Sequence, residues 1–140
     1  IGGGVTHGPL KDKDYSKKVN KKMRTKALFT ILSKKFSDNE IIFLDSLSLA
    51  DKKTKEAQEI LTNLSKIKGF EDISKKRGNR ALITLAEGAS KEGAKVGFKN
   101  IGTVAVSDVE NLNAVDALSY AYIVITDPEK SLEFLKSKQK

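Results

Sequence analysis

The chain has 140 residues, of which 39% are hydrophobic and 31% are charged, and its formal net charge is +8. This length suits one domain with a core of two or three layers. The sequence has no cysteine, which excludes disulfides and thiolate metal sites, and it has no apolar run near the ~20 residues that a membrane-spanning helix needs.

The net charge lies in the first quarter of the chain. Residues 1–35 contain ten Lys and Arg against two Asp, whereas residues 36–140 contain sixteen cationic and sixteen acidic residues. A cationic segment beside a neutral one indicates a polyanionic partner for the first and a packed core for the second. Nucleic acid is the first candidate for that polyanion.

Residues 1–18 are predicted to form an extended arm. Four glycines, Pro9 and alternating charges leave this segment little to bury, so its order would depend on a partner. The chain begins at Ile1 rather than at Met, and we expect that sequence upstream of Ile1 is missing.

From Val19 onward the spacing of apolar residues predicts an amphipathic helix. The predicted apolar arc consists of Val19, Met23, Ala27, Leu28, Ile31, Leu32 and Phe36. The opposite side carries Lys22, Lys26, Thr30, Ser33 and Lys34. Such a helix can pack on a core and still present lysines to a partner.

Further along, four short apolar runs indicate strands that are buried on both faces. They lie at 41–44, 81–85, 103–106 and 122–126, and helical patterns follow at 54–67, 88–98, 113–120 and after Pro128. Alternating strands and helices predict an α/β fold, with a Rossmann-like, open, mostly parallel sheet and flanking helices. We therefore predict an extended basic arm at 1–18 and a globular domain at 19–140, whose tail at 136–140 frays.

Three stretches carry a more specific pattern. The first combines a glycine run at 2–4, Gly8-Pro9, Tyr15-Ser16 and the run Lys21-Lys22-Met23-Arg24. The second is the helix at 27–32 that leads into the apolar run ending at Asp45. The third is Leu112-Asn113-Ala114-Val115-Asp116-Ala117-Leu118, followed by an apolar strand ending in Thr126. In this order they resemble the universal L-four family, large-subunit ribosomal protein four of bacteria.

The resemblance implies a structural constituent of the large ribosomal subunit in the cytoplasm. Its partners would be large-subunit (23S) ribosomal RNA and neighbouring ribosomal proteins, with no enzymatic activity, cofactor, membrane contact or small-molecule substrate. The chain would start on the returning limb of a loop that reaches toward the peptide exit tunnel. The stretches 66–80 and 86–102 depart from the family's pattern, so no contacts are carried over to them.

The arm and the first helix hold the side chains that RNA binding needs. Glycines let the backbone approach a sugar-phosphate chain, flat rings stack on unpaired bases, and long cations neutralise phosphates. The residues expected to bind RNA are Gly2, Gly3, Gly4, His7, Gly8, Tyr15, Lys17, Lys18, Lys21, Lys22, Arg24 and Lys26. Some charge on Lys11 and Lys13 is expected to pair with Asp12 and Asp14, and Lys34 and Lys35 are expected to be ordinary surface charge. The second basic cluster, 75–80, is either a solvated loop or a contact to a neighbouring RNA segment.

The alternative function is a small Rossmann-like nucleotide-binding domain or enzyme with an incidental basic tail. The glycines at 2–4 follow no strand and precede no Gly-Lys-Ser/Thr sequence, which argues against a phosphate loop. His7 is the only histidine, so neither a nucleophilic triad nor a metal site is expected. Asp45 and Asp108 are interpreted as turn or cap residues, and Asp116 as ordering a loop and a helix end. A regulatory role on messenger RNA, found in some family members, stays open.

Overall fold

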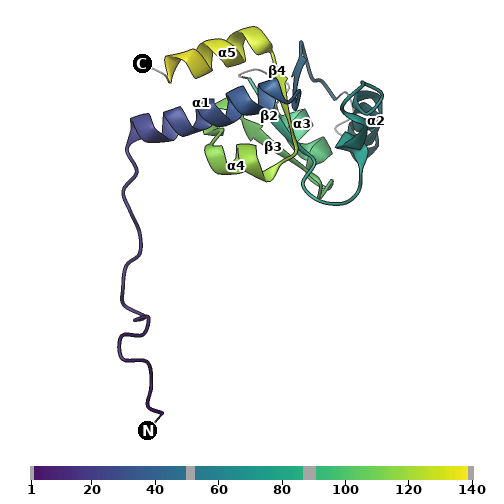
Figure 1. Cartoon of the computed structure of the whole chain (residues 1–140). Helices are drawn as coiled ribbons and strands as arrows, with labels where there is room; N and C mark the ends of the chain where they lie inside the picture. The colour runs from purple at the N-terminus through teal and green to yellow at the C-terminus, as the bar shows by residue number, and fades with distance from the viewer. Residues whose placement is uncertain (1, 50–52, 87–90, 139–140) are drawn as a thin grey trace.

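The computed structural model of the chain describes residues 2–49, 53–86 and 91–138. Within them, four strands form one sheet in the order β1-β4-β2-β3, and every neighbouring pair is parallel (Figure 1). The strands are β1 (Ile41–Leu44), β2 (Ala81–Leu85), β3 (Val104–Asp108) and β4 (Tyr122–Thr126). This confirms the predicted α/β fold with an open parallel sheet.

The two central strands explain the continuous apolar runs of the sequence. Strand β2 is buried along its whole length, and β4 is buried from its second residue onward. Ile83 of β2 pairs with Val124 of β4 on one side and with Val106 of β3 on the other. The edge strand β1 is less covered, and the Phe43 side chain is 41% exposed.

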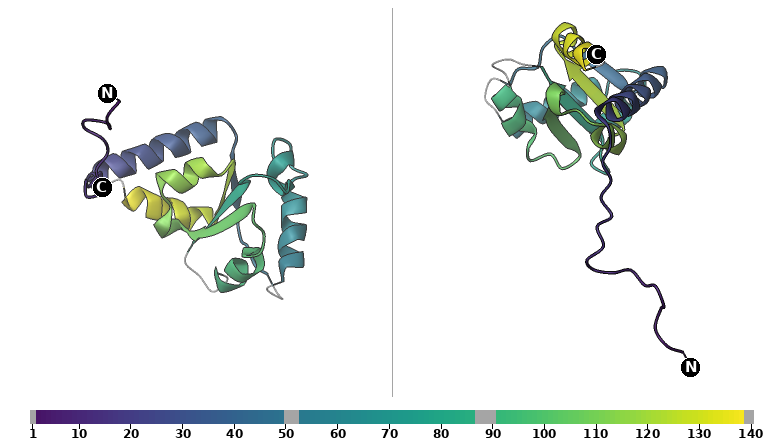
Figure 2. Two further views of the ribbon diagram at one scale, coloured as in Figure 1. Left: turned by 90° about the horizontal axis from the view of Figure 1, so that it is seen from below. Right: turned by 90° about the vertical axis from the view of Figure 1, so that its left-hand side faces the viewer.

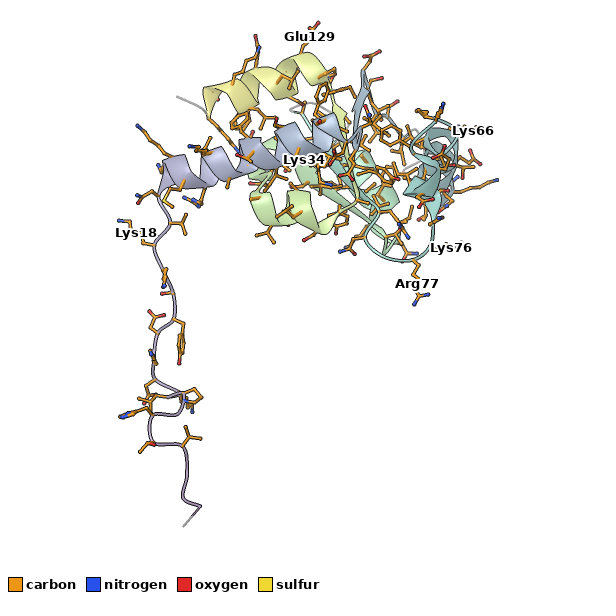
Figure 3. The ribbon with its side chains drawn as sticks, in the orientation of Figure 1. Lys18, Lys34, Lys66, Lys76, Arg77 and Glu129 are labelled. Atoms are coloured by element: carbon orange, nitrogen blue, oxygen red, sulfur yellow. The ribbon has the colours of Figure 1, made fainter. Side chains whose placement is uncertain are left out.

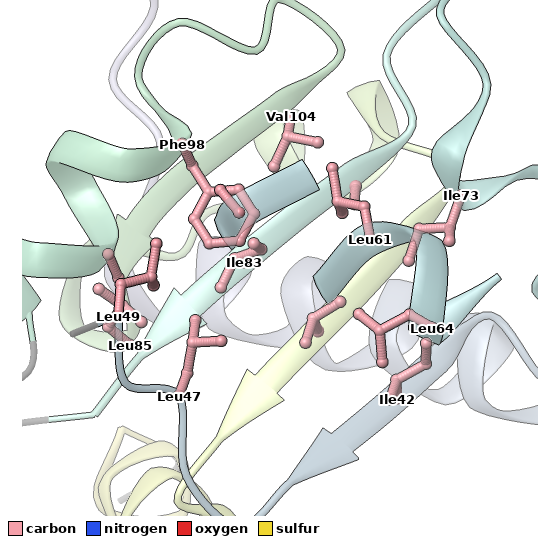
Figure 4. Close-up of a cluster of buried hydrophobic side chains, with 14 of the residues drawn as sticks. Ile42, Leu47, Leu49, Leu61, Leu64, Ile73, Ile83, Leu85, Phe98 and Val104 are labelled. Carbon is pink, nitrogen blue, oxygen red and sulfur yellow. The ribbon is translucent and has the colours of Figure 1, made fainter. Parts of the chain in front are cut away.

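Helices cover both faces of the sheet, so the body has three layers (Figures 1 and 2). On one face lie α2 (Thr54–Leu64), the 3-10 helix η1 (Glu71–Ser74) and α3 (Lys91–Phe98). There Leu61, Ile73 and Phe98 belong to one buried cluster with Ile83 of the sheet (Figure 4). Right-handed crossovers between parallel strands place such helices against the sheet.

The second face carries α1 (Lys21–Ser37), the 3-10 helix η2 (Val109–Asn111), α4 (Ala114–Ser119) and α5 (Pro128–Ser137). Its buried cluster joins Leu32 and Leu135 to Ile123 of the sheet. Pro128 occupies the first turn of α5, and the preceding Asp127 makes no side-chain cap bond. Its backbone instead takes a left-handed conformation, with φ 45°.

The predicted apolar arc of α1 is correct at Leu28 and Leu32, which are buried. It is wrong at Val19, Met23, Ala27 and Phe36, which are exposed. The start of α1 extends past the sheet, so the residues there have no core to pack on (Figure 1). Near the other end of the helix, the Phe36 ring lies beside the partly exposed Phe43 ring of the edge strand, with centroids 6.5 Å apart.

Other helix boundaries shift by a few residues. Helix α2 ends at Leu64, before the predicted 67, and α5 continues into the predicted fraying tail as far as Ser137. The predicted start of the third helix, at 88, lies outside the described residues. Buried Gly97 of α3 has a packing role, because a Cβ there would collide with the Leu49 side chain.

Residues 2–20 contain neither helix nor strand, and in Figure 1 they lead away from the sheet. Every residue of this segment is exposed except Gly8, which is half-buried beside Val5. The boundary between an arm at 1–18 and a domain at 19–140 stays a prediction.

Candidate nucleic-acid interface

The residues in the first turn of α1 do not stabilise the start of this helix. Asn20 makes no side-chain cap bond, and the turn contains no acidic residue. Lys21, Lys22 and Arg24 lie here instead, although the positive end of the helix dipole disfavours cations by about 0.3–1 kcal/mol each. An external anion at this helix start would reverse that penalty.

One side of α1 lines an open, shallow groove of about 1070 Å³ that the end of α5 helps to form. Cations and hydroxyls share its lining, and they are the donors that contact phosphate and ribose oxygens in nucleic-acid complexes. The lining residues are Lys21, Lys22, Thr25, Lys26, Phe29, Thr30, Ser33, Lys34, Ser37 and Lys138. We call this surface the α1 groove.

Most of the charge in the α1 groove has no internal partner. Within the described residues, Lys21, Lys22 and Lys26 make no ion pair with a carboxylate. Lys34 is paired, because its Nζ lies 2.7 Å from Asp38 Oδ1, and this hydrogen bond raises the pKa of Lys34. Three neighbouring cations are therefore free to bind an anion.

Lys138 is fixed at the rim of the α1 groove. Its Nζ donates to the Glu110 carbonyl oxygen at 2.6 Å and lies 4.9 Å from the centre of the Phe134 ring. Burial lowers the pKa of Lys138. Sequence patterns missed this residue because it lies more than 100 residues after α1. Lys34 was visible as part of the polar side but was expected to be ordinary surface charge.

The other predicted RNA-binding residues are exposed but lie outside the α1 groove. A Cβ on Gly2, Gly3 or Gly4 would meet nothing within 4 Å. Tyr15 is 63% exposed. His7, Lys17, Lys18 and Arg24 are also exposed, and Gly8 is half-buried. Thus the structure brings together Lys21, Lys22 and Lys26, and RNA binding by these and by the remaining residues stays a prediction.

Asp14 was expected to pair with a lysine of the arm, but its described hydrogen bonds come from Ser16. Its carboxylate accepts from the Ser16 backbone N–H at 2.8 Å and from the Ser16 hydroxyl at 3.0 Å, which lowers the pKa of Asp14. Lys13 lies instead with its Nζ 5.1 Å from the centre of the Tyr15 ring. A local turn rather than an ion pair satisfies Asp14.

The expectation for Lys35 is wrong, because this lysine is buried and belongs to the fold. Its Nζ donates to Glu40 Oε2 at 2.7 Å and to the carbonyl oxygens of Tyr120 and Ala121 at 3.0 and 2.8 Å. These bonds join the end of α1 to the residues just before β1 and β4. Lys35 is therefore not available to a ligand.

Of the two carboxylates at strand ends, only Asp108 has a described partner. Asp108 lies at the end of β3 and pairs with Lys95 at 2.8 Å and with Lys91 at 3.5 Å. The hydrogen bond from Lys95 lowers the pKa of Asp108. Asp108 occupies the N-cap position of η2, as the turn-or-cap interpretation allows, but its side chain makes no cap bond. Asp45 is exposed after β1.

Asp116 was predicted to order a loop and a helix end, and the structure places it in the first turn of α4. The Asn113 side chain accepts from the Asp116 backbone N–H at 2.8 Å, and its amide donates to Asp116 Oδ2 at 2.7 Å. This reciprocal pair caps α4.

Nothing in the described residues favours catalysis or a metal. No group of three or more His, Asp or Glu side chains there is close enough to hold a metal ion. No described helix is long and apolar enough to cross a membrane. A nucleotide would be expected at the carboxyl ends of the strands, between β2 and β4, where the following helices leave to opposite faces. The glycines at 2–4 are not at that position (Figure 1).

Comparison with known proteins gives one consistent result. The model of the ribosomal protein L4/L1 family matches residues 1–137. "Large ribosomal subunit protein uL4" of Lachnospira eligens is 38% identical over 125 residues, which are 89% of this chain and 53% of that protein. The proteins of the same name from Magnetococcus marinus and Finegoldia magna are 36% and 37% identical, over 94% of this chain and 57% and 58% of their own. The chain spans little more than half the length of these relatives.

Proposed function

Since the chain belongs to the ribosomal protein L4/L1 family, we propose that it is a structural constituent of the large ribosomal subunit. It binds large-subunit (23S) ribosomal RNA through the α1 groove and the cationic segment before it, and it contacts neighbouring ribosomal proteins. Its place is then the ribosome in the cytoplasm, and its role is architectural rather than enzymatic, without a cofactor. The segment before α1 belongs to a loop near the peptide exit tunnel.

The row of unpaired cations at the start of α1 carries this proposal. Lys21, Lys22 and Lys26 line one groove, and Lys21 and Lys22 lie in the first turn of α1, where cations cost the most stability. RNA phosphates reverse that cost, because they meet both the lysines and the positive end of the helix dipole. Each phosphate contact also releases counterions, which drives association.

The segment at 2–20 extends the same surface. Its exposed Tyr15 ring supports stacking on an unpaired base. The open space around Gly2, Gly3 and Gly4 supports close approach of a sugar-phosphate chain to the backbone. Such a segment becomes ordered when it binds.

A matched pair of triple variants tests the proposal. In one, Lys17→Gln, Lys18→Gln and Lys22→Gln remove three charges from the proposed interface. In the control, Lys55→Gln, Lys130→Gln and Lys136→Gln remove three exposed charges from elsewhere. Affinity for a fragment of large-subunit ribosomal RNA is measured from about 0.05 to 0.5 M salt.

The first variant should reduce the slope of log affinity against log salt by about 2, because each lost phosphate contact contributes roughly 0.7–0.9. The control should leave that slope unchanged. Equal losses in both variants would contradict an interface at the arm and α1. For the alternative nucleotide-binding function, a mononucleotide should instead raise the melting temperature of the wild-type chain.

A further inference from the structure

A second cationic surface lies on the other side of the body, between the end of α2 and the start of β2. Residues 66–80 contain six cations and two carboxylates, a net charge of +4, although residues 36–140 as a whole are neutral. The cations are Lys66, Lys68, Lys75, Lys76, Arg77 and Arg80. We call them the loop surface.

Both carboxylates of this stretch are already engaged. Asp72 lies 2.6 Å from Lys75 Nζ, and the hydrogen bond from Lys75 lowers the pKa of Asp72. Glu71 accepts from the Gly69 backbone N–H at 3.1 Å. Neither carboxylate makes an ion pair with Lys76 or Arg77.

Hydrogen bonds of Arg80 hold the end of the loop that carries Lys76 and Arg77. Arg80 Nε donates to the Arg77 carbonyl oxygen at 2.6 Å. The Arg80 backbone N–H donates to Thr103 and its carbonyl accepts from Tyr122, at 2.7 and 2.8 Å. The exposed side chains of Lys76 and Arg77 make no ion pair within the described part of the chain.

An open hollow of about 520 Å³ adjoins these cations. Its lining includes Lys76, Gly78, Asn79, Asn100, Gly102 and Thr103. Gly78 has φ +79°, a conformation that other residues rarely adopt, and a Cβ there would meet nothing within 4 Å. Side-chain amides, a hydroxyl and an open backbone suit ribose and phosphate oxygens.

The loop surface and the α1 groove are separated by the body of the protein. Figure 3 shows Lys76 and Arg77 at one end of the molecule and Lys18, before α1, at the other. Figures 1 and 2 likewise show α2 and the start of α1 far apart. The two surfaces therefore face different regions around the protein.

We propose that the loop surface is a second RNA-backbone-binding site, so that the protein joins two RNA segments at once. This inference rests on the proposed function, which supplies RNA as the partner. Arg77 offers a planar fork for phosphate. An acidic protein is a weaker fit, because protein interfaces have an apolar centre, whereas the exposed side chains around this hollow are polar or charged, among them Lys76, Asn79 and Asn100.

Binding of a short RNA duplex of about 10 base pairs to the full chain tests the proposal. Three proteins are compared with wild type: a loop variant (Lys76→Gln with Arg77→Gln), an α1 variant (Lys21→Gln with Lys26→Gln) and a control (Lys130→Gln with Lys136→Gln). Stoichiometry is read by native mass spectrometry and affinity by titration over a range of salt. Thermal unfolding shows that each variant is folded.

Wild type and control should bind two duplexes, whereas the loop and α1 variants should each bind one tightly. The salt slope for the loop site should fall by about 1.4–1.8 when its two cations are removed. A loop variant that still binds two duplexes with unchanged slope would overturn the inference. If the α1 variant binds one duplex in the same experiment, the proposed function survives.

Two other outcomes would also count against the loop surface. If the α1 variant and wild type bind equally, the proposed function fails, and the inference fails with it. If polyglutamate of equal charge displaces the duplex from the loop surface as readily as RNA does, the surface recognises acidic protein rather than RNA. The inference would then be wrong while the α1 result stands.

Discussion

The cations of the α1 groove and those of the sheet domain differ in where their partners lie. Lys22 and Lys26 face an open groove and have no carboxylate partner among the described residues. Lys35 and Lys95 are bound to oxygens of the same chain, at Glu40 and Asp108. A cation satisfied within the chain stabilises the fold, whereas an unsatisfied row of cations is available to an external anion.

Two adjacent lysines of α1 both make ion pairs, and they differ in how deeply they are buried. Lys34 lies on the exposed side of α1, and only 10% of the Lys35 side chain is accessible to solvent. Consecutive residues of an α-helix are rotated by about 100°, since 3.6 residues make one turn. One step along α1 therefore separates a cation of the groove from a cation of the core.

Removing Lys35 should have the largest effect on stability. In Lys35→Met, Glu40 and the carbonyl oxygens of Tyr120 and Ala121 lose their donor. We expect the free energy of unfolding to fall by about 2–4 kcal/mol, because partly buried acceptors are left unpaired. Urea denaturation measures the change.

Lys34→Met is the matched control. Its carboxylate partner Asp38 is solvent-accessible, so the denaturation midpoint should stay close to that of wild type. Equal destabilisation by the two substitutions would contradict the division between a core lysine and a groove lysine.

Removing charge from the groove should give the opposite result, with lost RNA affinity and unchanged stability. Lys22→Gln with Lys26→Gln deletes two cations one helical turn apart, and neither makes an ion pair in the described residues. We expect RNA affinity to fall about tenfold, which is ~1.4 kcal/mol. Binding titrations and denaturation curves of the same samples separate the two effects, and a lowered denaturation midpoint would contradict the prediction.

The fold was largely predictable because its strands carry local signals. The runs at 81–85 and 122–126 are the central strands, which are apolar on both faces. The strand order was not predictable, because the register of Ile41 with Ile123 joins residues far apart in the sequence. Local periodicity also failed for Met23, since it cannot show that the sheet ends before the helix does.

The candidate site was predictable only in part, because contacts between residues far apart in the sequence leave no local pattern. The spacing of Lys22 and Lys26 placed them on one side of a helix, and the structure confirms this. Lys138 joins them through tertiary packing. The burial of Lys35 depends on acceptors 85 and 86 residues away, which no helical pattern reveals.

Two glycines, Gly97 in the domain and Gly3 before α1, differ in how closely their surroundings pack. In Gly97→Ala the new methyl group would collide with the Leu49 side chain. Overpacking costs about 1–3 kcal/mol, and the gain in helix propensity returns about 1 kcal/mol. We expect the free energy of unfolding of Gly97→Ala to be lower than that of wild type by about 1 kcal/mol, and thermal unfolding measures the change. Gly3→Ala should leave the melting temperature unchanged, because a Cβ there meets nothing within 4 Å; a comparable loss at both positions would contradict this reasoning.

The smallest expected effect concerns the acid stability of the sheet domain. The hydrogen bond from Lys95 holds the pKa of Asp108 below its ordinary value of 3.8, and burial partly opposes this. A carboxylate with a lowered folded-state pKa stabilises the protein above the ordinary value, and this contribution is lost as the pH falls through the folded-state pKa. Wild type should therefore lose its advantage over Asp108→Asn as the pH falls below 3.8.

An NMR titration of the Asp108 carboxyl carbon tests the cause directly. In wild type its midpoint should lie below 3.8, and in Lys95→Gln it should rise, because the strongest partner is gone while Lys91 remains 3.5 Å away. The corresponding change in unfolding free energy should stay under about 1 kcal/mol, since Lys95 is partly exposed. If the midpoint does not move, the pair is not formed in solution, and Lys95 would then belong with the unpaired cations of the α1 groove rather than with Lys35.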